Sequence, residues 1–326
     1  MISKSPTITV LTSLYHCEKY LNGYFCHLSQ ISNMEDVEIL LLHNKALESE
    51  LRVIRKYAPK FGEHVRYIVI EERESLYSTL NRGVALARGK YVAMWNVDDI
   101  RLPDSLECEA RTLDKHPEAA LTYGDVAVVY EYGKTEGRFC YQPEYEEMPK
   151  EFLRSYFGVC FPMWRKSIHE KVGYFDEQMF SGGDFDFWVR VVRNYSLRKT
   201  KGLLGYYLNE YRGLSTSGWR QPVERTVIEL RYGQFDKIDF IYLPKAIRNY
   251  DLTRIHGDGK TFPIDQFFPD YRKFIITRLP LFLIGIIKFP FRLAMYLYRA
   301  IALLFILGPK RAIKKIANKI EVIVTR

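Results

Sequence analysis

The sequence predicts an α/β fold with a mostly parallel sheet that is covered by helices on both faces. Strand-like and helix-like stretches alternate four times within the first 120 residues, which is typical of successive β–α units. The strand-like stretches are almost continuously apolar, as is expected of strands buried on both faces. The chain has 326 residues, 47% of them hydrophobic, and can therefore bury a sizeable core.

The first four strand–helix pairs follow one another closely. The expected strands are ITVLTSLY, VEILLLHN, VRYIVIEE and KYVAMWNV. The expected helices are EKYLNGYFCHLSQI, ALESELRVIRKYAPKF, SLYSTLNRGVALARG and PDSLECEARTLDKH. Ligands of such sheets bind beyond the carboxyl ends of the strands, so the residues that follow each strand are the first candidates for a site.

The second half of the chain is more mixed. ALTYGDVAVVYEYG predicts a strand and GRFCYQPEYEEMP a polar loop. We expect helices and turns in EFLRSYFGVCFPMWRKSIHEKVGYFDE and GGDFDFWVRVVRNYS, then a strand and loop, then a helix in PVERTVIELRYGQF. The predicted organisation is a main domain over residues 1–235, with halves 1–130 and 131–235, a polar connector over 236–270 and a tail over 271–326.

Charge and cysteine usage exclude several classes of protein. The formal net charge of +9 comes from the tail, because residues 271–320 contain eleven Lys or Arg and no acidic residue. A nucleic-acid partner is therefore not expected for the main domain. The five cysteines form no CxxC or Cys/His motif, so no structural zinc site is predicted, and we interpret them as reduced thiols in a cytosolic setting. The first residues are interpreted as the first strand and not as a signal peptide.

Two adjacent acids, Asp98 and Asp99, end the fourth strand-like stretch in MWNVDDIRLP. Like charges side by side repel, so a positive partner is expected there. Mg²⁺ or Mn²⁺ commonly binds one or two carboxylates together with substrate phosphates. A nucleotide diphosphate held by such an ion would fit this position. The alternative is a surface cap, in which Asp99 or Asp104 begins the helix at PDSLE and Asp98 is solvated.

The order of these features resembles the family 2 glycosyltransferases, which are nucleotide-sugar enzymes of the GT-A fold. PTITVLTSLYHCEKYL is similar to their first strand and turn. SLYSTLNRGVALARGKYVAMWNVDDIRLPDSLE resembles their Asn-x-Gly, Ala-x-Gly, strand and DxD-type metal motif. PMWRKSIHEKVGYFDEQMFSGGDFDFWVR resembles their acceptor-side segment. The resemblance covers about residues 5–218 and implies a nucleotide-sugar-binding half over 1–130 and an acceptor half over 131–235.

The resemblance implies a role for each matching residue on the donor side. Asp98 and Asp99 would hold Mn²⁺ or Mg²⁺. Asn44 stands where the family usually has an Asp for the base, and Asn96 where many members have the first Asp of DxD. An Asn both donates and accepts, so uracil and a UDP-sugar stay compatible. The full set of predicted donor-binding residues is Thr12, Tyr15, Asn44, Tyr77, Asn81, Arg82, Asn96 and Asp98. Ordinary helix surface or core is the alternative for the residues between 77 and 82.

On the acceptor side the resemblance makes Asp184 the general base of an inverting, single-displacement reaction. The family usually has Glu before this position, and this chain has Gly183. Asp186 lies two residues further along the expected helix, so it points elsewhere, and an acceptor contact is assigned to it. The alternative for Asp184 is a helix cap. Met163 and Trp164 would form the acceptor wall, with core packing as the alternative for Trp164.

A third metal ligand is not assigned by the sequence. Many members of the family have a His in the loop that here reads YRGLSTSG, and this loop has none. The candidates that we could not rank are Asn209, Glu210, Ser215 and Thr216.

The tail is predicted to form amphipathic helices that lie on an anionic membrane surface. Its longest charge-free run, between Arg299 and Lys310, has ten residues, whereas a spanning helix needs about twenty. Arg292, Arg299 and Lys310 share one helical face, and Leu and Ile residues face elsewhere. Packing on the main domain, a homodimer, or a true span with snorkelling arginines are the alternatives.

These observations predict an inverting glycosyltransferase that is peripheral on the cytoplasmic face of a membrane. Its acceptor would be a membrane-held, lipid-linked glycan, as in assembly of a surface polysaccharide or a glycoprotein glycan. The rival interpretation is a non-catalytic, membrane-anchored scaffold that binds a nucleotide or a sugar, and the departures at Asn44, Asn96 and Gly183 favour it. A nucleotidyltransferase is disfavoured because TSLYHCEK is not a Gly-rich phosphate loop.

Overall fold

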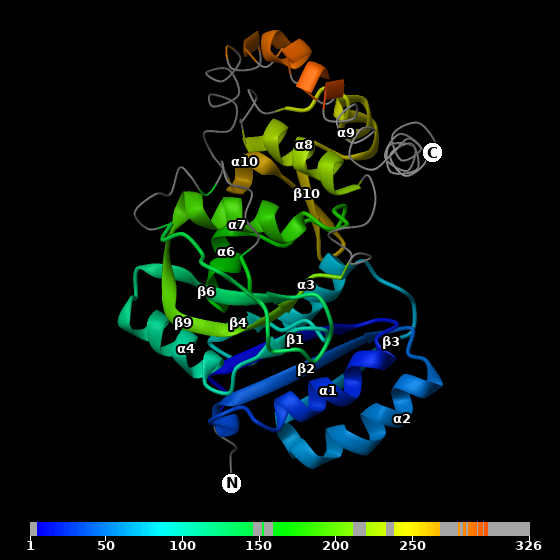
Figure 1. The fold of residues 1–326 in the computed structure, drawn as a ribbon, viewed down its shortest axis with the longest axis vertical. Coiled ribbons are helices and arrows are strands. Elements are labelled where there is room, and N and C mark those ends of the chain that lie inside the picture. The colour runs from blue at the N-terminus through cyan, green and yellow to red at the C-terminus, as the bar shows by residue number, and fades with distance from the viewer. Residues whose placement is uncertain are drawn as a thin grey trace. The chain divides into compact units, whose positions relative to one another are not determined.

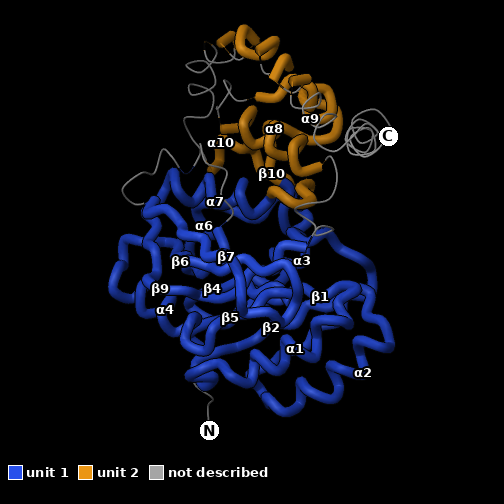
Figure 2. Tube along the Cα trace, viewed as in Figure 1, with its two compact units in different colours: residues 1–177, 183–210, 256–260 blue, residues 178–182, 211–255, 261–326 orange. Residues whose placement is uncertain are grey.

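The structure is a computed structural model. It describes residues 5–145, 152, 159–210, 220–232 and 238–267, and in the tail residues 280, 283–284, 286–291, 293–295 and 297–298. The described chain forms two compact units (Figure 2). Unit 1 comprises residues up to Glu177, Gly183–Glu210 and His256–Lys260. Unit 2 comprises Gln178–Gly182, Tyr211–Ile255 and the chain from Thr261 onward.

Unit 1 is built on a nine-stranded sheet in the order β3-β2-β1-β4-β8-β6-β9-β5, with β7 paired to β6 (Figure 1). Its strands are β1 (Ile8–Leu14), β2 (Val37–Asn44), β3 (Val65–Ile70), β4 (Tyr91–Met94), β5 (Ile100–Arg101), β6 (Ala119–Val129), β7 (Arg138–Cys140), β8 (Met163–Arg165) and β9 (Ser196–Leu208). Its helices are α1 (Glu18–Leu28), η1 (Met34–Asp36), α2 (Glu48–Tyr57), η2 (Ala58–His64), α3 (Leu76–Leu86), α4 (Ser105–Lys115), η3 (Lys166–Ile168), α6 (His169–Val172) and α7 (Gly183–Asn194).

The parallel half of the sheet confirms the predicted fold class. β1 pairs in parallel with both β2 and β4, and β2 pairs in parallel with β3. Val10 belongs to the core cluster that α1 and β2 also form. Leu11, on the opposite face of the same strand, instead lies against Gly83 of α3. Helices therefore cover both faces, which explains why these strands have no polar alternation.

The other half of the sheet, which mixes parallel and antiparallel pairs, corrects one prediction from the sequence. Met163–Arg165 forms the short strand β8 between β4 and β6, and not part of a helix. β6 and β9 then form a long parallel pair with two irregularities near Asp125, and the end of β9 pairs with β5. As a result, residues 205–208 lie beside the segment that follows Asp99. Three residues are too few to show a sequence periodicity, which is why β8 gave no signal.

Unit 2 contains α8 (Arg220–Tyr232), α9 (Leu243–Asn249) and α10 (Ile264–Phe267). The strands β10 (Arg254–Gly257) and β11 (Lys260–Pro263) pair with each other. In unit 2, Glu224 of α8 accepts hydrogen bonds from the backbone N–H groups of Phe180, Ser181 and Gly182. Within the predicted connector, residues 236–270, the stretches 243–249, 254–257 and 260–267 form helices and strands.

Candidate active site

Asp98 and Asp99 follow β4 at the carboxyl end of the parallel strands, and their environments differ. Asp99 is 4% exposed, and both of its carboxylate oxygens accept hydrogen bonds. The Leu208 backbone N–H lies 2.9 Å from Oδ1, and the Asn96 amide nitrogen lies 3.0 Å from Oδ2. Asp98 is half-buried. The hydrogen bonds of Asp99 come from the β9 end and from the turn itself, so Asp99 does not cap α4.

Electrostatics at this pair favour the binding of a cation. Burial raises the pKa of Asp98, and the charge of Glu210 raises it further, while Lys19 lowers it. Burial and the neighbouring Asp98 raise the pKa of Asp99 to about 8. Within the described part of the chain, Asp98 forms no ion pair. A divalent cation would relieve this repulsion, and carboxylate oxygens are ligands that Mg²⁺ and Mn²⁺ prefer. The residues present therefore fit such an ion.

Glu210 and Lys19 lie at the edge of this acidic site. The Lys19 Nζ donates to both carboxylate oxygens of Glu210, at 2.9 and 3.1 Å. Among the four candidates for a third metal ligand, Glu210 is the one whose charge acts on Asp98. Ser215 and Thr216 lie outside the described residues.

Asp184 lies in the first turn of α7 and is half-buried. Its Oδ1 accepts a hydrogen bond from the Tyr77 hydroxyl at 3.3 Å. Gly183 allows this approach, because a Cβ there would meet the Tyr77 ring at 2.7 Å. The glycine that departs from the family pattern is thus required by the packing of Tyr77 on α7.

Cys160, which the sequence gave no reason to select, connects the two groups of acids. Burial raises the pKa of its thiol to about 12, and the charges of Asp99, Cys140 and Asp184 contribute to that increase. One thiol is therefore close enough to both Asp99 and Asp184 to respond to their charges. Asp99 and Asp184, far apart in sequence, therefore both act on this one thiol.

The nucleoside end of the predicted donor site is partly exposed. Tyr15, after β1, is 37% exposed, and the Arg73 guanidinium lies 4.3 Å from the centre of its ring. Arg82 is paired with Glu74 at the surface. Thr12 is buried, with its hydroxyl 2.7 Å from the Tyr24 hydroxyl.

Two predicted donor-binding asparagines instead hold loops together. The Asn44 side chain donates to the Thr79 hydroxyl and accepts from the Glu74 N–H, both at 2.9 Å. The Asn81 side chain donates to the Phe175 carbonyl at 2.9 Å and accepts from the Phe175 N–H at 3.0 Å. Asn44 and Asn81 are each 3% exposed. Direct donor contact by Asn81 is therefore corrected to a structural role.

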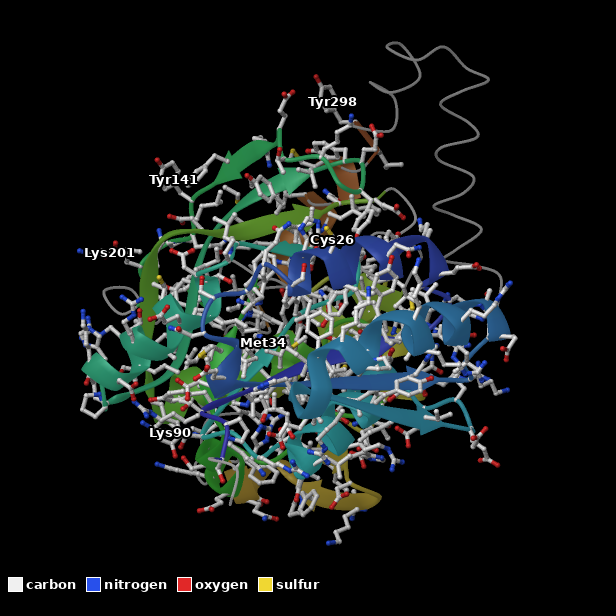
Figure 3. All side chains as sticks on the ribbon, turned by 90° about the horizontal axis from the view of Figure 1, so that it is seen from below. Cys26, Met34, Lys90, Tyr141, Lys201 and Tyr298 are labelled. Carbon is white, nitrogen blue, oxygen red and sulfur yellow. The ribbon has the colours of Figure 1, made fainter. Side chains whose placement is uncertain are left out.

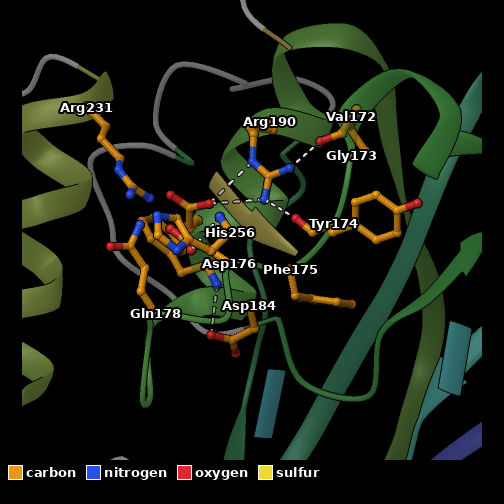
Figure 4. Close-up of polar contacts among 12 residues, drawn as sticks. Val172, Gly173, Tyr174, Phe175, Asp176, Gln178, Asp184, Arg190, Arg231 and His256 are labelled. Carbon is orange, nitrogen blue, oxygen red and sulfur yellow. Dashed lines mark hydrogen bonds and ion pairs between the residues drawn. The ribbon is translucent and has the colours of Figure 1, made fainter. Parts of the chain in front are cut away.

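The three predicted acceptor residues are also corrected. Met163, Trp164 and Asp186 are 0% exposed. Trp164 packs against Trp188 with ring centres 5.3 Å apart, so core packing describes it and a ligand platform does not. Asp186 pairs with Arg190 one helical turn later, with both side chains fully buried. Figure 4 shows the same Arg190 donating to the carbonyls of Val172 and Tyr174.

A groove elsewhere in unit 1 does not include any of the predicted site residues. It has a volume of about 850 Å³ and lies between α2, η2 and β3. Lys45, Leu51, Arg55, Tyr67 and Val69 are among its lining residues. Its walls offer no pair of carboxylates, so the chemistry points to the acidic edge after β4.

Comparison with known proteins identifies the family of this chain. The model of glycosyl transferase family 2 matches residues 9–173, about half of the chain, and the protein belongs to that family. An uncharacterized glycosyltransferase of Methanocaldococcus jannaschii is 28% identical over 193 residues, which are 58% of this chain and 66% of that protein. The putative glycosyltransferase EpsE of Bacillus subtilis is 26% identical over 133 residues, 40% of this chain and 47% of the relative. The matches thus span less than two thirds of these relatives.

Solved structures support the same fold. S. aureus TarS 1–349 in complex with UDP-GlcNAc has a TM-score of 0.56 at 16% identity, and the match covers 74% of this chain and 72% of that one. The mannosyltransferase PcManGT from Pyrobaculum calidifontis, in complex with GDP-Man and Mn²⁺, has a TM-score of 0.53 at 14% identity, with coverage of 99% and 89%. The fold is therefore that of the GT-A glycosyltransferases, as the sequence predicted.

Proposed function

We propose that this protein is an inverting glycosyltransferase that transfers a sugar from a nucleotide diphosphate sugar, a UDP-sugar in the first instance, to an acceptor hydroxyl. The observation that carries the proposal is the pair of mutually repelling carboxylates, Asp98 and Asp99, which follows β4 at the carboxyl end of the parallel strands. Family membership supports it, and so do structural neighbours whose complexes contain UDP-GlcNAc and GDP-Man.

Asp184 performs the proton transfer in this proposal. Its carboxylate accepts the proton of the acceptor hydroxyl while that oxygen forms a bond to the anomeric carbon. The bond from the anomeric carbon to the diphosphate oxygen breaks, and its electron pair leaves with the nucleoside diphosphate. Tyr77 holds the carboxylate in place. General-base assistance of this kind contributes about 10²–10⁴-fold to the rate.

In this proposal Asp98 and Asp99 would hold Mn²⁺ or Mg²⁺, with Glu210 as the further carboxylate. The bound ion supplies positive charge against the phosphate oxygens of the donor. The chain itself keeps Asp99 in position through Leu208 and Asn96. Tyr15 and Arg73 form the exposed wall for the nucleoside.

We further propose that the enzyme works at the cytoplasmic face of a membrane, where its acceptor, a lipid-linked glycan, is held. In the described tail residues, apolar side chains are strongly exposed: Ile287 by 67%, Phe291 by 73% and Tyr298 by 70%. Lys288 lies exposed among them. An anionic membrane surface would cover such apolar groups and attract the basic ones, each worth about 1 kcal/mol.

The predicted basic face of Arg292, Arg299 and Lys310 lies outside the described residues. No helix in the described part of the chain has both the length and the apolar character that crossing a bilayer requires. The five cysteines are free thiols, which agrees with a reducing compartment.

Donor hydrolysis tests the catalytic proposal directly. A panel of nucleotide sugars is incubated with the full chain and Mn²⁺, Mg²⁺ or a chelator. We expect metal-dependent release of one nucleoside diphosphate, which also identifies the base. Binding of a donor without turnover in the presence of any acceptor glycan would instead support the scaffold.

Flotation with vesicles tests the membrane proposal separately. Association with anionic vesicles that is lost at high salt is the expected result. Association that resists carbonate would favour a span, and absence of association together with a dimer in solution would favour the homodimer.

A further inference from the structure

Cys17, His43 and Glu50 form a buried cluster that the proposed reaction does not use. Cys17 precedes α1, His43 lies near the end of β2, and Glu50 lies in the first turn of α2. The thiol sulfur, an imidazole nitrogen and a carboxylate oxygen lie within 4.8 Å of one another. Because the three residues come from different elements, the sequence gave no spacing motif for them.

Hydrogen bonds fix the orientation of each group in this cluster. His43 Nδ1 lies 2.9 Å from the Tyr67 hydroxyl, and Nε2 lies 3.0 Å from Oε2 of Glu50. The Glu50 carboxylate also accepts from the backbone N–H groups of Cys17, at 2.6 Å, and Leu47, at 3.0 Å. Tyr67 thus fixes the far side of the imidazole, as the outer partner of a metal-bound histidine usually does.

The protonation states suit a divalent ion. Burial lowers the pKa of His43, which keeps its imidazole neutral. Burial would raise the pKa of Glu50, but hydrogen bonds from Leu47, Cys17 and His43 outweigh it and leave this pKa lowered. Burial and the nearby Glu50 raise the pKa of the Cys17 thiol, while the N–H groups of Tyr15 and Cys17 lower it. A cation bound between the Cys17 thiolate and the Glu50 carboxylate would attract both groups and so offset the repulsion between them.

We propose that Cys17 Sγ, His43 Nε2 and the Glu50 carboxylate bind one Zn²⁺ ion. Sulfur, imidazole nitrogen and carboxylate oxygen are the zinc donors of proteins, at about 2.0–2.3 Å from the ion. Tetrahedral geometry at those lengths places the ligand atoms about 3.3–3.6 Å apart. His43 Nε2 and Glu50 Oε2, 3.0 Å apart, already lie near that separation, so it is the thiol sulfur, within 4.8 Å of the other ligand atoms, that has to approach by up to about 1 Å. On binding, the thiol proton is released to solvent, and the imidazole keeps one proton, on Nδ1, donated to Tyr67.

A cysteine nucleophile is the less suitable interpretation of the same residues. Cys17 is 2% exposed, and the two imidazole nitrogens of His43 contact the Tyr67 hydroxyl and the Glu50 carboxylate, not the thiol. A substrate would have to reach a sulfur inside the core cluster. A small ion requires far less room, and the groove lined by Tyr67, Lys45 and Ile54 offers an approach from the α2 side.

The proposal is independent of the proposed function. Zinc at this position would tie the turn after β1, the end of β2 and the start of α2 together. Asn44 directly follows His43, and Tyr15 lies two residues before Cys17, so the ion would fix the frame of the nucleoside end of the site and take no part in the transfer.

Metal content of the full chain tests the proposal. The protein is purified without added metal or chelator, loaded with Zn²⁺, desalted and analysed by elemental mass spectrometry. We expect about one tightly held zinc ion per chain. Replacement by Co²⁺ should give a thiolate-to-cobalt charge-transfer band together with the visible bands of a tetrahedral site.

Three variants make the outcome specific. Cys17→Ser should lose the charge-transfer band, whereas Cys26→Ser should keep it, because Cys26 is exposed on α1 (Figure 3). Asp98→Asn should also keep the zinc, which separates this site from the proposed donor metal. Zinc content far below one ion, or a band that survives in Cys17→Ser, would overturn the proposal and leave the cluster as a hydrogen-bonded support.

A second measurement covers the case in which Cys17→Ser does not fold. In the unaltered protein under mild denaturant, zinc should protect Cys17 from alkylation and leave Cys26 equally reactive. Equal labelling of Cys17 with and without zinc would count against the site.

Discussion

The acids after β4 and the acids inside α4 and α7 differ in what neutralises them. Glu109 on α4 and Asp186 on α7 are fully buried, and each is paired with an arginine, Arg101 and Arg190 respectively. Asp98 is half-buried and has no ion pair within the described residues. A buried acid that is paired with an arginine of the same chain has a structural role. An acid that lies beside another acid without such a partner is suited to binding a cation. Five predictions test this difference, from the largest expected effect to the smallest.

Asp186→Asn should lower the stability of the protein. It removes one partner of a fully buried ion pair and leaves the buried Arg190 charge without this carboxylate. A loss of about 3–5 kcal/mol in the free energy of unfolding is expected. Urea denaturation measures it, with Glu48→Gln as control, because Glu48 pairs with Arg55 at the surface. Similar losses in both variants would remove the distinction between the two kinds of acid.

Asp184→Asn should act on turnover and not on stability. We expect nucleotide binding to persist while turnover falls at least about a hundredfold, near the lower bound for general-base catalysis. Steady-state kinetics with donor and acceptor, together with donor titration, separate the two quantities. Near-normal turnover would exclude Asp184 from the mechanism.

Asp98→Asn should abolish stabilisation by metal and nucleotide. Mn²⁺ with a nucleoside diphosphate at about 100 times its Kd stabilises a binding protein by about 2.7 kcal/mol. Thermal unfolding should show this increase in the unaltered protein and in Asp104→Asn, an exposed neighbour that begins α4. The Asp98→Asn variant should show none of it. A normal increase in the stability of that variant would indicate that the metal binds elsewhere.

Tyr77→Phe should reduce turnover modestly. The ring and its packing against Gly183 stay, and only the hydroxyl that donates to Asp184 is lost. A hydrogen bond of this kind contributes about 1 kcal/mol, so kcat should fall about fivefold with KM unchanged. A change in KM alone would assign Tyr77 to donor binding.

The reactivity of the Cys160 thiol should depend on the charges of Asp99 and Asp184. Alkylation requires the thiolate, and a pKa of about 12 leaves very little thiolate at pH 8. Its labelling rate, followed by mass spectrometry, should rise with pH beyond 9 and stay far below that of the exposed Cys26. Asp184→Asn should lower the Cys160 pKa and speed its labelling slightly. No change would place Asp184 away from this thiol.

The sequence alone determined the parallel sheet, the family and the motif after β4. Continuous apolar strands and the order of short motifs are local patterns, and they survive in any sequence that buries both faces of a sheet. The fold class and the family were predicted correctly because each rests on residues that are neighbours in the chain. Asp184 was selected in the same way, and its role stays a prediction.

Only the tertiary structure decided which polar and aromatic residues are buried. Trp164 and Asp186 lie inside a core that residues distant in sequence complete, so a motif match could not distinguish them from ligand contacts. Leu208 reaches Asp99 only because β9 returns beside β5, and Cys17, His43 and Glu50 meet only where β1, β2 and α2 converge. Burial and long-range contacts depend on how distant segments pack together, and this packing cannot be derived from a local sequence pattern.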